Sequence, residues 1–279
     1  MATPNPFSLR TTARLDRPPD YSRITREATM IDRRIHGLVH ELRLDRPPVN
    51  ALSPELLIAI GEEVAEAPER GARALILSGR EGLFSAGLDV PLMVAMDPPE
   101  LRNALDAFFG AMEALACSPL PIAAAITGHS PAGGAILALF CDWRVMAEGD
   151  FKIGLNEVKI GVPMPEVVAA LAARTVGPRR AEALCVSGRL IAPNEALEIG
   201  FVDQLAPVEE VVEAARLWCE DTIASPPHAM AKTRTRMRRD LVELVRRNLS
   251  ADTERLAEEW FEPELQGTLR QLMASLKGE

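Results

Sequence analysis

The sequence predicts an α/β fold, in which buried strands alternate with helices over the first half of the chain. Short apolar runs at 73–79 and 120–128 have the length of strands that are buried on both faces. Segments between them, such as 98–117, carry apolar residues at helical spacing. After Pro163 the sequence indicates many helices and little strand. Repeated strand and helix units imply an α/β core, and we expect the last third to be a helical appendage.

The first predicted elements are a hairpin and a helix. Residues 28–44 alternate in polarity around His36 and Gly37, which is typical of two short strands joined by a tight turn. The segment RPPVNALSPEL then interrupts the strand pattern. Ser53 is a suitable N-cap there, and Pro54 suits the first position of a helix. The apolar face of this helix is formed by Leu56, Leu57, Ile60 and Val64.

Strands and helices then follow one another along the chain. The expected order is a strand at 73–79, a turn in FSAGLDV, a helix over 98–117, a strand at 120–128, a helix over 131–140, a strand in DWRVMAE, and mixed strand and loop in FKIGLNEVKIG. Breaks between the later helices are expected at Gly177-Pro178, Pro193, Pro207 and Ser225-Pro226-Pro227. The predicted organisation is a flexible tail at 1–27, a core at 28–205 and a helical region at 206–279.

Composition limits the class of protein and its partners. The 279 residues are 47% hydrophobic and 25% charged, as in soluble globular proteins. No apolar run approaches the roughly 20 residues that a membrane span needs, so we expect no membrane association. The net charge of −9 disfavours nucleic acid, because phosphate binding needs a basic surface. The arginines, prolines and aspartates of 1–27 favour the tail of a cytoplasmic protein over a targeting peptide, with the mitochondrial matrix as the alternative.

The cysteines and histidines do not indicate a metal site. The four cysteines are widely spaced and match no zinc pattern. Three of them lie among apolar neighbours, so we expect buried free thiols in a reducing compartment. The four histidines are scattered along the chain, and no two have the spacing of a metal-binding pair. We therefore expect no metal.

Two turns rich in small residues each follow a predicted buried strand. In FSAGLDV, Gly87 can adopt a positive φ, so the chain can turn sharply and direct the Ala86 N–H into a pocket. In GHSPAGG, Pro131 suits a helix start, and free N–H groups near Gly133 can bind an anion. A plain tight turn and close helix–strand packing are the structural alternatives. If the two turns converge, their N–H groups form an oxyanion hole.

The segment GLNEVKIG supplies an acid. Glu157 lies between Leu155 and Val158 in an otherwise apolar stretch that glycines flank. Burial raises the pKa of a carboxyl group, which suits a general base that works near neutral pH. The alternative is a surface or ion-paired glutamate.

Five segments, in this order and at these separations, resemble the crotonase superfamily: RPPVNALS, FSAGLDV, GHSPAGGAILALFCDWRV, IGLNEVKIG and EALEIGFVDQL. Within it, PAGG and GLNE are most similar to the mitochondrial short-chain Δ3,Δ2-enoyl-CoA isomerase branch. The resemblance covers residues 33–276. It implies a crotonase-like spiral of ββα units, a C-terminal helical region for trimerisation, and a coenzyme A thioester as substrate.

The resemblance also implies roles for individual residues. It assigns the oxyanion donors to the N–H groups of Ala86 and Gly133, and the catalytic carboxylate to Glu157. Asn156 is expected to line the acyl site. The residues expected to contact the coenzyme A portion are Ala86, Gly87, Leu88, Asp89 and Val90. No cofactor is implied, since coenzyme A is part of the substrate, and the expected assembly is a homotrimer or a hexamer.

The helix after GHSPAGG lacks an acid that hydratases of this superfamily carry. Those enzymes hold a water between two glutamates, one of which matches Glu157 and the other Ile136. Isoleucine cannot hold a water, whereas moving a double bond from the β,γ to the α,β position needs one base. The resemblance therefore favours an isomerase with Glu157 as the single acid and base. A hydratase that uses Glu157 alone, another crotonase reaction such as thioester hydrolysis or decarboxylation, and an inactive acyl-CoA binder are the alternatives.

Two features of the C-terminal third are weaker signals. The first is a basic run on a predicted helix, which comprises Lys232, Arg234, Arg236, Arg238 and Arg239. We favour a solvated helix surface for this run over contact with the coenzyme A phosphates. The second is an apolar stripe that we expect to pack near an active site or a neighbouring subunit, formed by Leu265, Leu269 and Leu272. Candidates for shaping an acyl pocket are Phe108, Met164 and Trp260.

Overall fold

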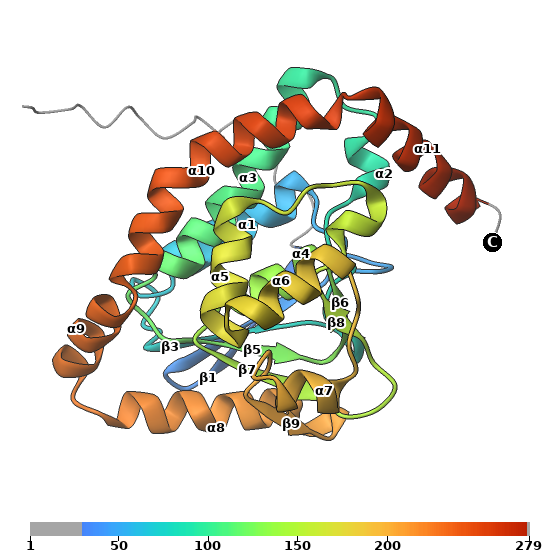
Figure 1. The fold of residues 1–279 in the computed structure, drawn as a ribbon. Helices are drawn as coiled ribbons and strands as arrows, with labels where there is room; N and C mark the ends of the chain where they lie inside the picture. The colour runs from blue at the N-terminus through green and yellow to red at the C-terminus, as the bar shows by residue number, and fades with distance from the viewer. Residues whose placement is uncertain (1–29, 278–279) are drawn as a thin grey trace, which may run out of the picture.

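A six-stranded sheet lies at the centre of the structure, a computed structural model that describes residues 30–277 (Figure 1). The strand order is β1-β2-β3-β5-β7-β9. The strands are β1 (Ile31–His36), β2 (Val39–Leu44), β3 (Ala74–Ser78), β5 (Ile122–Ile126), β7 (Trp143–Ala147) and β9 (Gln204–Ala206). The hairpin β1–β2 is antiparallel, as predicted, and the other neighbours are parallel. The tail expected at 1–27 lies outside the described residues.

A second, three-stranded parallel sheet gives the fold its spiral character. It consists of β4 (Gly82–Leu83), β6 (Gly128–Pro131) and β8 (Ile153–Gly154). Each of these short strands follows a strand of the large sheet, so that one turn of the chain adds a strand to each sheet and then a helix. This is the predicted α/β spiral of ββα units.

Alternate residues of the large sheet pack against different helical layers. One face packs against α1 (Pro54–Glu66), α3 (Pro98–Cys117) and α4 (Gly133–Phe140) in the main core. Helix α1 begins as predicted, because the Ser53 side chain accepts a hydrogen bond from the Leu56 N–H at 3.4 Å. The opposite face, which includes Ile76 and Val145, packs against α8 (Val211–Ala224). Burial on both faces explains why the parallel strands read as apolar runs.

The remaining helices surround this core (Figure 1). They are α2 (Val90–Met93), α5 (Glu166–Val176), α6 (Pro178–Ser187), α7 (Pro193–Glu198), α9 (Pro227–Met237), α10 (Arg239–Trp260) and α11 (Pro263–Lys277), with short 3-10 helices η1 (Glu157–Ile160) and η2 (Val208–Glu210). Helix α10 packs along α3 and α5, and α11 contacts η1. Of the helices within residues 30–277, none is both long and apolar enough to cross a membrane. The expected trimer or hexamer stays a prediction.

Two local predictions were wrong. Pro131 does not begin a helix: it pairs with Gly154 as the last residue of β6, and α4 begins at Gly133. The basic run is not a uniformly solvated surface, because the side chains of Arg234 and Arg238 are only 10% and 11% exposed.

Candidate active site

The turn that contains FSAGLDV is held against the loop before α1 by backbone hydrogen bonds. The Ala86 N–H donates to the Val49 carbonyl oxygen at 3.0 Å, and the Leu52 N–H donates to that of Gly87 at 2.8 Å. The Ser85 hydroxyl adds a bond to the Asn50 carbonyl at 2.7 Å. These hydrogen bonds fix the turn, and one of them occupies the Ala86 N–H.

Asn50 explains why the segment RPPVNALS supports that turn. Its buried side chain donates to the carbonyl oxygens of Leu44 and Phe84, each at 3.1 Å, and accepts the Arg46 N–H at 2.9 Å. Its φ of +47° is in the left-handed region, which asparagine tolerates better than most residues. The asparagine therefore joins the end of β2 to the start of the FSAGLDV turn.

The second turn leads directly into α4. Ala132 has a φ of +48° and a ψ of −125°, a strained conformation for a residue with a side chain. Its N–H donates to the Gly154 carbonyl at 2.8 Å. No side chain caps the start of α4, so the Gly133 N–H lies at an open helix N-terminus.

The two turns meet through two glycines. A Cβ atom on Gly133 would lie 3.2 Å from the Leu88 nitrogen, and one on Gly87 would lie 3.1 Å from the Gly133 nitrogen. Gly87 also has a φ of +88°, which a side chain would oppose. The absence of side chains at both positions lets the two backbones approach closely.

The free donors at this contact are those of Leu88 and Gly133. Within residues 30–277, neither N–H has a hydrogen-bond acceptor. The prediction that named Ala86 is therefore corrected, because the Ala86 N–H is bound to Val49. The free N–H of this turn lies two residues further along, at Leu88.

Glu157 lies close to the second turn in the fold. Strands β6 and β8 pair through Ser130 with Ile153 and Pro131 with Gly154, so the chain reaches Glu157 three residues after that contact. The residue is 7% exposed. Among the described residues, neither of its carboxylate oxygens has a hydrogen-bond partner.

Burial dominates the acidity of this carboxyl group. Loss of solvent raises the pKa of Glu157 to about 7, and the nearby backbone N–H of the residue itself opposes this shift only in part. A group with this pKa is both a competent base and a competent acid near neutral pH. The apolar neighbours of Glu157 in the sequence predicted this shift.

Among residues 30–277, no second carboxylate contributes to the pKa shift of Glu157. Ile136, in the first turns of α4, is 1% exposed.

Sequence reasoning missed the half-buried Cys185 on α6, whose pKa is raised by burial and then by the charge of Glu157. Asn156 is half-buried, and its Oδ1 accepts no hydrogen bond from residues 30–277. Residues 30–277 contain no cluster of three or more metal-binding side chains.

The expected coenzyme A contacts continue from Leu88 into α2. Asp89 caps this helix by accepting the Leu92 N–H at 3.1 Å, and it pairs with Arg46 at 2.7 Å. Both interactions of the Asp89 carboxylate thus hold the turn in place. Contacts of Ala86, Gly87, Leu88, Asp89 and Val90 with a ligand stay predictions.

An apolar cluster connects the two parts of the site. Leu88 and Ile160 both pack against it, and it contains Trp260. Leu265 of the predicted apolar stripe also belongs to it, and a Cβ on Gly161 would lie 3.0 Å from the Leu265 Cδ1. Helix α11 therefore covers the end of η1. Of the other two pocket candidates, Phe108 lies in the main core and Met164 packs against that core.

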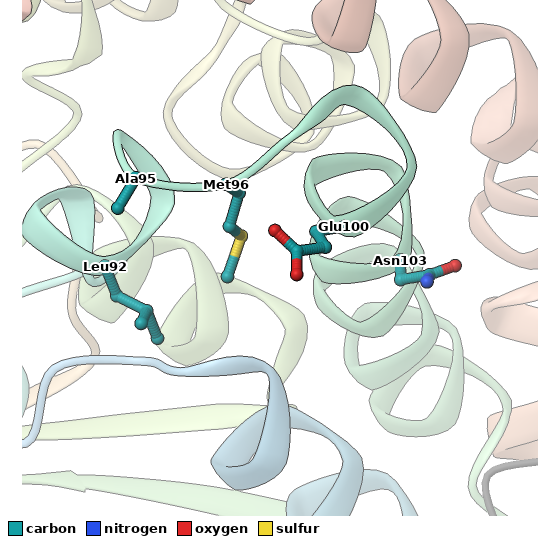
Figure 2. Close-up of a pocket in the computed structure, with 5 residues that line it drawn as sticks. All are labelled: Leu92, Ala95, Met96, Glu100 and Asn103. Atoms are coloured by element: carbon teal, nitrogen blue, oxygen red, sulfur yellow. The ribbon is translucent and has the colours of Figure 1, made fainter.

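A surface pocket of about 310 Å³ opens on the outer side of this cluster, between α2 and α3 (Figure 2). The Glu100 carboxylate points toward the Met96 side chain (Figure 2). Met96 also packs against the apolar cluster, so it separates the pocket from the cluster. The Glu100 carboxylate accepts the Asp97 N–H in the capping box of α3. The pocket is thus distinct from the surroundings of Glu157.

A family model and similar proteins of known sequence all indicate the same family. The Enoyl-CoA hydratase/isomerase family matches residues 34–269. The chain is 33% identical to human "Enoyl-CoA delta isomerase 1, mitochondrial" over 85% of its length and 80% of that protein. It is 37% identical to "Probable enoyl-CoA hydratase EchA17" of Mycobacterium tuberculosis over 78% of its length and 81% of that protein.

A solved structure resembles the whole fold. The crystal structure of human mitochondrial delta3-delta2-enoyl-CoA isomerase superposes with a TM-score of 0.86 at 30% identity. The match covers 90% of this chain and 99% of that one. Similar relatives thus include both an isomerase and a hydratase, so overall identity does not choose between these reactions.

Proposed function

Because this chain belongs to the enoyl-CoA hydratase/isomerase family of enzymes, we propose that it moves the double bond of a 3-enoyl-CoA to the 2-trans position. The substrate is an acyl-CoA thioester, and no separate cofactor takes part. The observation that carries the proposal is the single buried carboxylate of Glu157, with Ile136 in place of a second acid.

The thioester oxygen binds between the N–H groups of Leu88 and Gly133. Unpartnered backbone donors are costly unless something accepts their hydrogen bonds, and a ligand oxygen can satisfy both. The open N-terminus of α4 adds its dipole at Gly133. Since negative charge grows on this oxygen as the α-proton leaves, the pair stabilises the dienolate more than the substrate.

Glu157 carries the proton between two carbon atoms. Its carboxylate removes a proton from the α-carbon, and the electrons of that C–H bond form the dienolate. The resulting carboxylic acid then delivers the proton to the γ-carbon, while the double bond forms between the α- and β-carbons. The reaction is balanced without water, and Glu157 returns to its ionised state.

Apolar surroundings favour this reaction over hydration. Adding water across a double bond requires a water held against the β-carbon, and Ile136 offers it neither a donor nor an acceptor. The main alternative is an enoyl-CoA hydratase that works with Glu157 alone, since hydratases are among the relatives. Thioester hydrolysis or decarboxylation are further alternatives, because an oxyanion hole also serves them.

The variant Glu157→Gln tests the proposal. Glutamine keeps the shape of the side chain but cannot accept and return a proton, so isomerisation of 3-enoyl-CoA should fall by about 10⁴-fold. Binding of a saturated acyl-CoA, measured by calorimetry, should remain close to that of the wild type. A variant that isomerises at a comparable rate would show that another group moves the proton.

A further inference from the structure

Arginines on and just after helix α9 join this helix to the core by ion pairs. No residue of α9 is fully buried, yet the helix lies between α8 and α10 and connects the core to the C-terminal helices (Figure 1). Arg234, on α9, and Arg238, at its end, extend inward, and their side chains are 10% and 11% exposed. Both side chains donate hydrogen bonds to the core from this segment.

Both arginines bind one carboxylate, that of Asp142. Arg234 donates to the Asp142 Oδ2 at 2.9 Å, and Arg238 donates to the Oδ1 at 2.7 Å. The same carboxylate accepts the Ile122 N–H at 2.9 Å, at the beginning of β5. A further hydrogen bond joins Arg234 to the Ser118 carbonyl oxygen. We call Asp142, Arg234 and Arg238 the anchor cluster.

The anchor cluster lies at the C-terminal end of α4. Arg238 donates to the Phe140 carbonyl oxygen, the last residue of the helix, at 2.6 Å. Arg144 donates to the Cys141 carbonyl at 3.1 Å. Cationic donors at helix carbonyls satisfy groups that have no partner inside the helix, and they oppose the negative end of its dipole.

The other end of the same helix is open. Helix α4 has eight residues, all buried, so it spans only about 12 Å between Phe140 and Gly133. Because it is closely packed along its whole length, a shift at one end is transmitted to the other rather than absorbed. The position of the Gly133 N–H therefore depends on what holds the Phe140 end.

We propose that Asp142, Arg234 and Arg238 are positioning residues for the reaction, which hold α4 from its C-terminal end so that the Gly133 N–H meets the thioester oxygen. They touch no reacting atom. Their side chains come from α9 and from the segment after α4, so the anchor cluster also ties the start of the C-terminal helices to the helix that bears the oxyanion donor. The inference rests on the proposed binding of a thioester at Gly133.

Two substitutions distinguish positioning from a long-range effect of charge. Arg238→Met removes one positive charge and the bond to Phe140, while Asp142→Asn removes a negative charge and weakens both ion pairs. If the cluster positions α4, both variants should lower kcat by about 10-fold or more, with a smaller change in KM. If only charge mattered, the two variants would act in opposite directions. The control is Arg189→Met, which breaks the exposed ion pair with Glu195.

Carbonyl polarisation gives a readout that general stability would not change. The stretching frequency of a saturated acyl-CoA labelled with ¹³C at the thioester carbonyl should decrease on binding to the wild type. The decrease should be smaller in Arg238→Met and Asp142→Asn, and unchanged in Arg189→Met. Arg238→Lys keeps the charge but lacks the two separate terminal nitrogens with which Arg238 holds Asp142 and Phe140, so it serves if the methionine variant does not fold.

The inference is overturned if folded variants show the wild-type carbonyl frequency and isomerise within about twofold of the wild type, or if Asp142→Asn is faster than the wild type. If the wild type binds acyl-CoA but does not isomerise it, the proposed function fails. The carbonyl frequencies would still decide whether the anchor cluster positions Gly133.

Discussion

The backbone N–H of Ala86 donates a hydrogen bond to the carbonyl oxygen of Val49 at 3.0 Å. This bond decides which of the amide groups in FSAGLDV can serve a ligand. It uses the Ala86 N–H to hold the turn against the preceding loop, and it leaves the Leu88 N–H beside Gly133 without an acceptor in residues 30–277. Packing between two loops thus decides which N–H groups of this turn are free.

A crystal structure with a bound acyl-CoA should show the thioester oxygen within about 3.2 Å of the nitrogens of both Leu88 and Gly133. The Ala86 N–H should remain on Val49. In an assay of 3-enoyl-CoA isomerisation, Gly133→Ala should lose activity by about 10²-fold, because its Cβ would crowd the Leu88 nitrogen at 3.2 Å. A thioester oxygen bound to the Ala86 N–H would contradict this assignment.

The pH dependence should follow the ionisation of Glu157. The base is active as the carboxylate, and burial raises its pKa to about 7. We therefore expect kcat/KM to rise with pH, to level off above about 7, and to fall about tenfold per pH unit well below it. An acid limb near the ordinary glutamate value of about 4.3 would show that Glu157 is not the buried base.

The same carboxyl group should lower the stability of the protein at high pH. Its pKa is raised on folding, so the folded state holds the proton more tightly than the unfolded state between pH 4.5 and about 7. Stability is then lost as the pH rises through that window, by at most about 3 kcal/mol. Glu157→Gln should therefore melt at a higher temperature than the wild type at pH 8, and the difference should disappear near pH 4. Equal melting temperatures at both pH values would contradict the burial of an ionisable carboxyl group.

Ile136→Glu tests why the first turns of α4 are apolar. A second carboxylate there can hold a water with Glu157, so the variant should gain measurable hydration of 2-enoyl-CoA. It should also lose stability, since Ile136 is 1% exposed and a buried charge without a partner is costly. Ile136→Gln, of similar size and without the charge, is the matched control. A folded glutamate variant that hydrates no faster than the glutamine variant would remove this explanation.

Local patterns in the sequence predicted much of the fold. The N-cap at Ser53, the hairpin at His36 and Gly37, and the helix over 98–117 depend on residues that are close in the chain, and all three were confirmed. The start of α4 was not predictable in this way. Pro131 suits a helix start, but pairing of β6 with β8 keeps it in a strand.

Contacts between distant segments account for the errors at the site. The glycine in FSAGLDV indicated a turn, but only the packing of residues 45–53 decides that Leu88 rather than Ala86 is free. Arg234 and Arg238 were expected on a solvated helix, because their spacing in the sequence does not indicate an ion pair with Asp142. That partner lies 92 residues before Arg234 in the chain. The raised pKa of Glu157, by contrast, was predicted from the apolar character of its segment, and burial in the fold is its cause.

The most direct test of a single-carboxylate isomerase compares two rates in the wild type. One sample receives 3-enoyl-CoA and the other 2-enoyl-CoA, at equal concentrations, and the absorbance of the conjugated thioester is followed. We expect conjugation to appear rapidly in the first sample and to disappear slowly or not at all in the second. Faster loss of conjugation from 2-enoyl-CoA than its gain from 3-enoyl-CoA would contradict this expectation, because Glu157 would then activate water without a second acid.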